Sequence, residues 1–97
     1  MTKANEIILI TINGMDRPGV TAALTEILAN NNAVILDIGQ ADIHNQLSLG
    51  ILSQCTEENS GNILKELLFK SYELDVNIRF SPISEAEYSE WVGMQGK

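Results

Sequence analysis

The spacing of apolar residues along this chain changes between a period of two and a period near 3.6, and this alternation limits the folds open to it. Four segments have the composition and alternation of β-strands, namely 6–13, 33–44, 47–54 and 75–82. Two intervening segments, beginning at Pro18 and near Ser60, carry one apolar stripe each at helical spacing. The order is therefore β-α-β-β-α-β, which predicts an α+β sandwich with two helices on one face of a four-stranded antiparallel sheet.

A sandwich of this order is ferredoxin-like, and its two helices leave the second face of the sheet uncovered. Segment 6–13 is apolar on both faces and should form a central strand. Its two faces carry Ile8, Ile10 and Ile12 on one side and Ile7 and Leu9 on the other. Because an exposed apolar surface of this kind usually marks an interface, we expect a partner sheet or a second domain to cover it.

The other strands carry further predictions about turns. Gly39, inside segment 33–44, suggests a β-bulge or the close approach of another backbone. Segments 33–44 and 47–54 should form an antiparallel hairpin, and Pro82 should end the last strand. Asn59 or Ser60 could cap the second helix.

Residues 84–97 are predicted to lie outside the domain, which spans 1–83. Ser84 and Glu87 have the spacing of a capping box, so a short helix should begin there. One side of this helix would carry Tyr88, Trp91 and Val92. Hydrophobic side chains so near the end favour the start of a linker to a downstream domain, with a frayed natural terminus as the alternative.

Composition excludes several classes of partner. The 97 residues suit one domain, and the net charge of −7 disfavours nucleic acid and anionic membranes. RNA-binding modules of this topology stack bases on aromatic side chains of their central strands, and the corresponding strands here carry Ile, Leu and Ser instead. Apolar runs are too short to cross a bilayer, and a single cysteine, Cys55, suits a reducing compartment, so we expect a cytoplasmic protein.

The residue inventory offers no catalytic or metal site. His44 and Cys55 are the only histidine and cysteine, too few for a metal site, and they should lie toward opposite ends of the predicted hairpin. Phosphate-binding glycine loops are also missing from the sequence. We therefore expect neither catalytic residues nor a cofactor in this segment.

The link 13–20, Asn-Gly-Met-Asp-Arg-Pro-Gly-Val, carries more polar groups than a simple turn requires. Pro18 suits the first position of a helix, and Asp16 or Arg17 would then be the N-cap. An ordinary capping turn explains these residues without any ligand.

The same link also suits a site for a zwitterion. Backbone N–H groups of Gly19 and Val20, at the start of a helix, would attract a carboxylate. Asp16 could accept a hydrogen bond from an ammonium group, and Asn13 could donate or accept. The residues alone leave the capping turn and the binding site as equal alternatives.

The stretch MDRPGVTAAL, opening a helix after an apolar strand, resembles the ACT domain over about residues 6–82. Segment 16–54 is similar to the amino-terminal ACT domain of bacterial phosphoserine phosphatases, which are hydrolases of the haloacid-dehalogenase type. The resemblance implies the non-catalytic regulatory part of such an enzyme of serine biosynthesis. The phosphatase motif D-x-D-x-[T/V/S] has no match here, so Mg²⁺ would be expected only in the missing phosphatase domain.

The resemblance further implies a homodimer that holds a small amino acid, such as L-serine, at the subunit interface. The matching ligand-binding positions are Asn13, Asp16, Arg17, Gly19 and Val20 in the link and, more loosely, Leu36, Asp37 and Ile38 in the second strand. Two alternatives remain, a purely structural dimerisation domain and a stand-alone ACT-type regulator.

Overall fold

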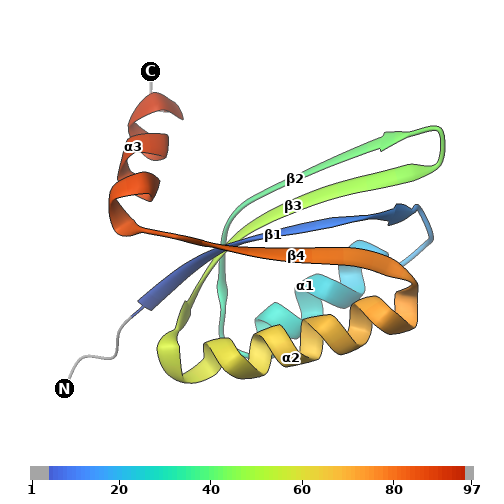
Figure 1. The fold of residues 1–97 in the computed structure, drawn as a ribbon, viewed down its shortest axis with the longest axis horizontal. Coiled ribbons are helices and arrows are strands. Elements are labelled where there is room, and N and C mark those ends of the chain that lie inside the picture. Colours follow the sequence, from blue (N-terminus) through green and yellow to red (C-terminus); the bar gives the residue numbers. More distant parts are fainter. Residues whose placement is uncertain (1–4, 96–97) are drawn as a thin grey trace.

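The structure, a computed structural model, describes residues 5–95, and it leaves undescribed the side chains of Glu85, Trp91, Val92, Met94 and Gln95. The predicted order βαββαβ is confirmed, followed by a third helix (Figure 1). The elements are β1 (Asn5–Met15), α1 (Val20–Asn30), β2 (Val34–Ile43), β3 (Gln46–Thr56), α2 (Glu57–Leu74), β4 (Val76–Ile83) and α3 (Glu85–Gln95). The expected alignment of Trp91 and Val92 with Tyr88 lies outside the described side chains.

The four strands form one antiparallel sheet in the order β2-β3-β1-β4. β1 is central, as its two apolar faces predicted, and Ile10 lies opposite Ile51 of β3 and Phe80 of β4. Helices α1 and α2 cover one face, and α3 lies toward the other (Figure 1). We call these the helix face and the second face.

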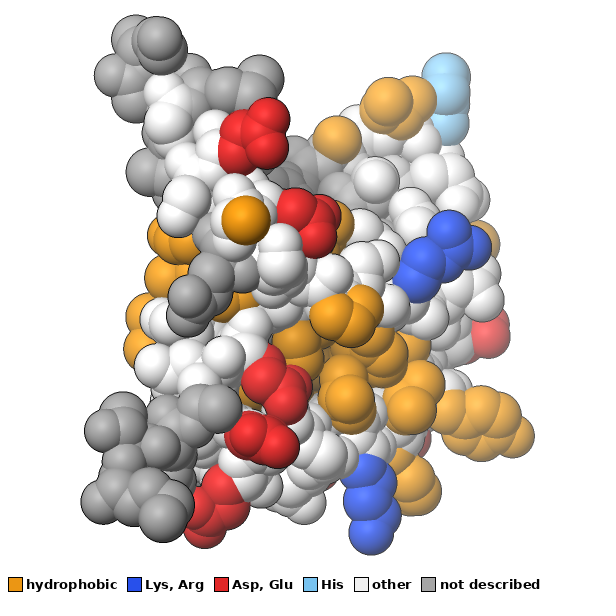
Figure 2. All heavy atoms as spheres, turned by 60° about the vertical axis from the view of Figure 1, so that its left-hand side comes forward, with side chains coloured by type: hydrophobic (Ala, Val, Ile, Leu, Met, Phe, Trp, Pro, Cys, Tyr) orange, Lys and Arg blue, Asp and Glu red, His pale blue; other side chains and the backbone are white. Residues whose placement is uncertain are grey.

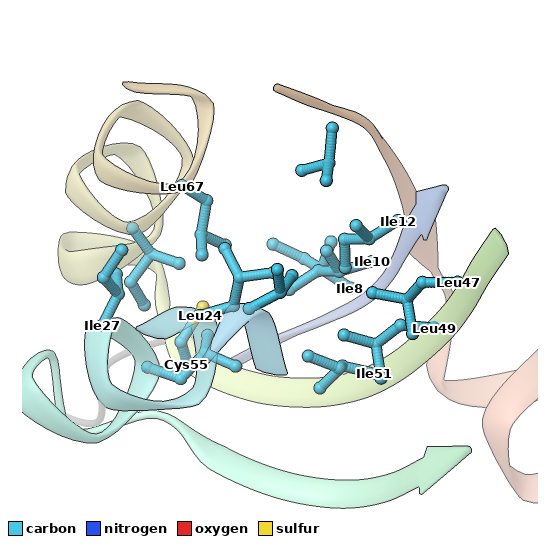
Figure 3. Close-up of a cluster of buried hydrophobic side chains, with 14 residues drawn as sticks. Ile8, Ile10, Ile12, Leu24, Ile27, Leu47, Leu49, Ile51, Cys55 and Leu67 are labelled. Atoms are coloured by element: carbon cyan, nitrogen blue, oxygen red, sulfur yellow. The ribbon is translucent and has the colours of Figure 1, made fainter. Parts of the chain in front are cut away.

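The core fills the space between the helix face and the two helices, as the alternation in β1 and β3 requires. Side chains from the strands and from both helices point toward one another there (Figure 3). Its most deeply buried members include Ile10, Ile12, Leu24, Leu28, Leu47, Leu49, Ile51, Ile63 and Leu67. On the second face, Ile7 and Leu52 are also buried but lie outside this core cluster.

Helix α1 begins later than the sequence predicted. Its N-cap is Gly19, which is left-handed with φ of 87° and provides no side-chain cap. The N–H of Val20 donates instead to the Arg17 carbonyl at 3.4 Å, closing a turn before the helix. The prediction of Pro18 as the first helical residue, with Asp16 or Arg17 as its cap, is wrong because this left-handed glycine separates the proline from the helix.

Helix α2 begins earlier than predicted, so the assignment of its cap to Asn59 or Ser60 is wrong. Its N-cap is Thr56, whose hydroxyl accepts from the N–H of Asn59 at 3.3 Å. Glu57 and Glu58 occupy the first turn, where their charges suit the helix dipole. Acidic residues directly after a threonine were the signal for this start.

The predicted hairpin of β2 and β3 is confirmed. It turns through His44 and Asn45, both with positive φ (52° and 65°), as a two-residue type I′ turn requires. The bulge in β2 falls between Ile35 and Asp37, at Leu36, and not at Gly39, where it was expected. The extra residue at Leu36 is accommodated within β2 itself, and Gly39 pairs regularly with Gly50 of β3.

The last strand and the last helix meet at a confirmed capping box. The N–H of Glu87 donates to the Ser84 hydroxyl at 3.1 Å, and the Glu87 carboxylate accepts from the N–H of Ser84 at 3.4 Å. Pro82 does not end β4, which runs on to Ile83. A proline is tolerated there because β4 is an edge strand.

Candidate functional site

The link between β1 and α1 is exposed and is held against the hairpin. Residues 15–19 are all exposed, and the N–H of Asp16 donates to the Asn45 carbonyl at 2.8 Å. Arg17 Nη2 lies 3.8 Å from Asp75 Oδ2 at the end of α2, with both side chains largely in solvent. The pair is therefore weak, and Arg17 can exchange this carboxylate for another.

The start of α1 offers backbone donors to solvent. Gly19 has no side chain to cap the helix, and the first turn contains no acidic residue. The first N–H groups of a helix lack partners within the helix, and the helix dipole favours an anion beside them. A free carboxylate is the ligand group that such an end binds readily.

β2 reaches this end of α1 through a hydrogen bond that the sequence did not reveal. The Thr21 hydroxyl donates to Gln40 Oε1 at 2.8 Å, and Gln40 Nε2 donates to Asp42 Oδ2 at 3.4 Å. Gln40 lies opposite Leu49, so its side chain is on the helix face. The site thus joins the link, the first turn of α1 and the second half of β2. In the sequence, the only indication of this contact was a polar residue, Gln40, at a position of β2 that faces the helices.

The predicted ligand residues fall in different places. Asp16, Arg17 and Gly19 lie together in the exposed link, whereas the Val20 side chain is 1% exposed and belongs to the core. The backbone N–H of Val20 already donates to the Arg17 carbonyl at 3.4 Å, so a ligand would have to share or replace that hydrogen bond. Asn13 alternates with Ile12 and so lies on the second face, away from α1.

The three predicted residues of β2 are divided by the bulge. Leu36 is the bulged residue, Asp37 lies opposite Leu52 on the second face, and Ile38 lies opposite Ile51 on the helix face. The structure does not bring Asp37 to the start of α1, where Gln40 stands instead. β2 is also a free edge of the sheet, with exposed aliphatic side chains at Val34, Ile35, Ile38 and Ile43.

Within residues 5–95, no three His, Cys, Asp or Glu side chains are grouped closely enough to hold a metal ion. Burial raises the pKa of the Cys55 thiol, and the nearby Glu6 carboxylate raises it further, so the thiol stays protonated near neutral pH. None of the described helices is long and apolar enough to cross a membrane.

The architecture is that of a ferredoxin-like α+β domain with a polar link before an uncapped helix. A family model described as the ACT domain matches residues 6–81, and the chain belongs to this family. ACT domains are regulatory modules rather than catalytic ones. An ACT domain protein from Streptococcus pneumoniae shares the fold, with a TM-score of 0.69, 22% identity, and coverage of 79% of this chain and 89% of that one.

The sequence relatives are of two kinds, a protein matched over most of its length and a longer enzyme matched over a short segment. A UPF0237 protein of Methanococcus maripaludis is 32% identical over 82 residues, which cover 80% of this chain and 91% of that protein. Phosphoserine phosphatase SerB2 of Mycobacterium tuberculosis is 48% identical over 48 residues, which cover 50% of this chain. The match spans only 12% of the length of that phosphatase.

Proposed function

We propose that this chain is a regulatory module that binds a small amino acid at the start of α1 and dimerises through β2. The proposal rests on the start of α1, which has no side-chain cap and lies between an exposed polar link and a free strand edge. A regulatory role is proposed because the chain belongs to the ACT family, whose domains are regulatory.

The two charges of an amino acid suit different parts of the site. The ligand carboxylate would accept from the first N–H groups of α1, and its ammonium group would donate to Asp16. Space is available, because a side chain at Gly19 would meet nothing within 4 Å. Thr21 and Gln40, already joined at 2.8 Å, could orient a small hydroxyl-bearing side chain such as that of L-serine.

Dimerisation through β2 would place a second copy beside this site. The unpaired edge of β2 can continue the sheet into another chain, and its exposed aliphatic side chains would be buried there. The ligand would then lie at the subunit interface. A ligand can regulate only if it binds one arrangement of the two copies more tightly than another.

We also place the chain at the amino end of a cytoplasmic phosphoserine phosphatase of serine biosynthesis. In this proposal residues 1–83 are the regulatory domain, and 84–97 begin the connection to a haloacid-dehalogenase-type domain, which would hold Mg²⁺. The similarity to SerB2 over 48 residues supports this. The similarity to nearly the whole length of a UPF0237 protein favours the alternative of a stand-alone regulator.

Calorimetric titration of the chain with L-serine, glycine and L-alanine tests the ligand. We expect binding that Asp16→Asn weakens about tenfold, as the loss of a charge-assisted hydrogen bond would. Glu26→Gln removes one negative charge from an exposed position of α1 and should leave the affinity unchanged. The absence of heat at millimolar amino acid would exclude the effector role, and binding unaffected by Asp16→Asn would exclude this site.

Sedimentation equilibrium tests the dimer and the ligand-free alternative. Ile38 is 44% exposed on β2, so Ile38→Lys should weaken dimerisation, whereas Leu68→Lys on α2, at a position 52% exposed, should not. A dimer that ignores every amino acid would support a purely structural dimerisation domain. Equal effects of the two lysines would argue against β2 as the interface.

A further inference from the structure

The second face of the sheet carries a hollow whose floor is a pair of glycines. Gly39 of β2 lies directly opposite Gly50 of β3, and a side chain at either position would meet nothing within 4 Å. Gly39 follows Asp37 by two residues, so both lie on the face away from α1 and α2. Two missing side chains at facing positions therefore leave an open depression in the sheet surface.

Helix α3 turns this depression into a groove of about 440 Å³. Apolar side chains of three strands line it, from Leu9, Leu52 and Ile83. The remaining lining residues besides the two glycines are Asp37 on β2 and Glu87 and Tyr88 on α3. Grooves of this volume, mostly apolar with a few convergent polar groups, are typical of small-ligand sites.

The charge of the groove favours one class of ligand. Its described lining includes two carboxylates, Asp37 and Glu87, and no basic side chain. Figure 2 shows acidic side chains at several places on one face of the molecule, and the whole chain carries a net charge of −7. This field attracts cations and repels free carboxylates. The aromatic ring of Tyr88 can also contact a cation through its face.

We propose that this groove binds a small organic cation with an apolar body, such as an arylalkyl amine. The apolar body would lie on the Gly39–Gly50 floor, and the ammonium group would lie near Asp37 and Glu87. The groove is on the opposite face of the sheet from the start of α1, so this site is separate from the proposed amino-acid site. A zwitterion binds here less well, because its carboxylate faces two like charges.

The first test compares four ligands that share a phenyl ring on a two-carbon chain, in NMR titrations of the full chain. They are 2-phenylethylamine, the alcohol 2-phenylethanol, the zwitterion L-phenylalanine and the anion 3-phenylpropionate. We expect the amine to shift the resonances of Gly39, Gly50 and Tyr88 and to bind at least about fivefold more tightly than the other three. Equal binding of the alcohol or the anion would overturn the proposal.

The second test fills the groove. Neither glycine has a positive φ, so Gly39→Val is compatible with the strand and places a side chain over the floor. We expect this variant to lose amine binding and to keep its melting temperature. Asp42→Asn, on the same strand but on the helix face, should leave amine binding unchanged. Unaltered amine binding by a folded Gly39→Val would place the ligand elsewhere.

A third variant, Glu87→Gln, keeps the capping box, because glutamine accepts the same hydrogen bond from Ser84. We expect it to weaken amine binding about fivefold, the size of one partly exposed charge pair. Asp16→Asn should not change the affinity for the amine. If the chain proved not to bind amino acids at the start of α1, amine binding in the groove would therefore still stand. The resonances of the groove could instead shift with protein concentration and stay unchanged when amine is added. That result would show that a second copy occupies the groove and would refute the proposal.

Discussion

Replacing Gly19 with alanine isolates the energetic cost of one backbone conformation. Gly19 has φ of 87° and is exposed, and a Cβ there would meet nothing within 4 Å. Steric contact therefore adds nothing, and the whole penalty comes from forcing an L-residue into the left-handed region. That penalty is about 1–2 kcal/mol.

A loss of about 1 kcal/mol lowers the melting temperature of a domain of this size by roughly 4–8 °C. Thermal unfolding followed by circular dichroism, with urea unfolding to give the free energy, would measure the effect of Gly19→Ala. Gly19→Asn should be less destabilising, because asparagine tolerates left-handed backbone. Gly39→Ala is the matched control at an open, regular strand position and should change stability little.

A Gly19→Ala variant that unfolded at the temperature of the unaltered chain would contradict a left-handed backbone at this position. A Gly19→Asn variant less stable than Gly19→Ala would contradict it as well, because the order of the two substitutions follows from the backbone conformation alone. A large loss from Gly39→Ala would show that the sheet surface at this position is more crowded than the structure indicates.

Three further predictions concern stability. A Cβ at Gly14 would lie 2.8 Å from Val76 Cγ1 and 3.1 Å from its Cα, so Gly14→Ala should cost about 1–3 kcal/mol in urea unfolding, and a neutral result would contradict this close approach. Thr56→Ala removes the N-cap of α2 and should cost about 0.5–2 kcal/mol, whereas Thr56→Ser should restore most of it. Burial raises the pKa of Cys55 in the folded chain, so its contribution to stability is complete below the unfolded pKa of about 8.5 and is lost as pH rises toward the folded value. Cys55→Ala should remove the part of the loss of stability at alkaline pH that comes from this thiol. In the folded chain, Cys55 should react slowly with a thiol reagent at pH 8, and rapid reaction would argue against its burial.

The periodicity of the strands was sufficient to predict the fold. Segment 6–13 is apolar on both faces, which identified the central strand, and its alternation grouped Ile8, Ile10 and Ile12 on the face that the core occupies. Helix starts were harder to predict, because capping depends on local dihedral angles. A proline near a helix start does not reveal that a glycine after it turns left-handed, as Gly19 does.

The candidate site was predictable only in part. The link residues Asp16 and Gly19 follow from sequence because they are neighbours in the chain. The contact of Thr21 with Gln40 joins residues 19 positions apart and depends on how β2 passes α1. The bulge at Leu36 also reverses the faces of the residues after it, which places Asp37 on the second face. Simple alternation cannot reveal such a reversal.

The two edges of the sheet have different consequences for growth of an assembly. In the proposed dimer, each β2 would pair with its own equivalent about a twofold axis, which closes the assembly at two copies. Pairing of β2 with β4 of another copy would instead add chains without limit and give a filament. Pro82 in β4 lacks the N–H that such a ladder requires, so this edge is a poor template for the next chain. A single proline at the outer strand thereby favours a closed pair over a polymer.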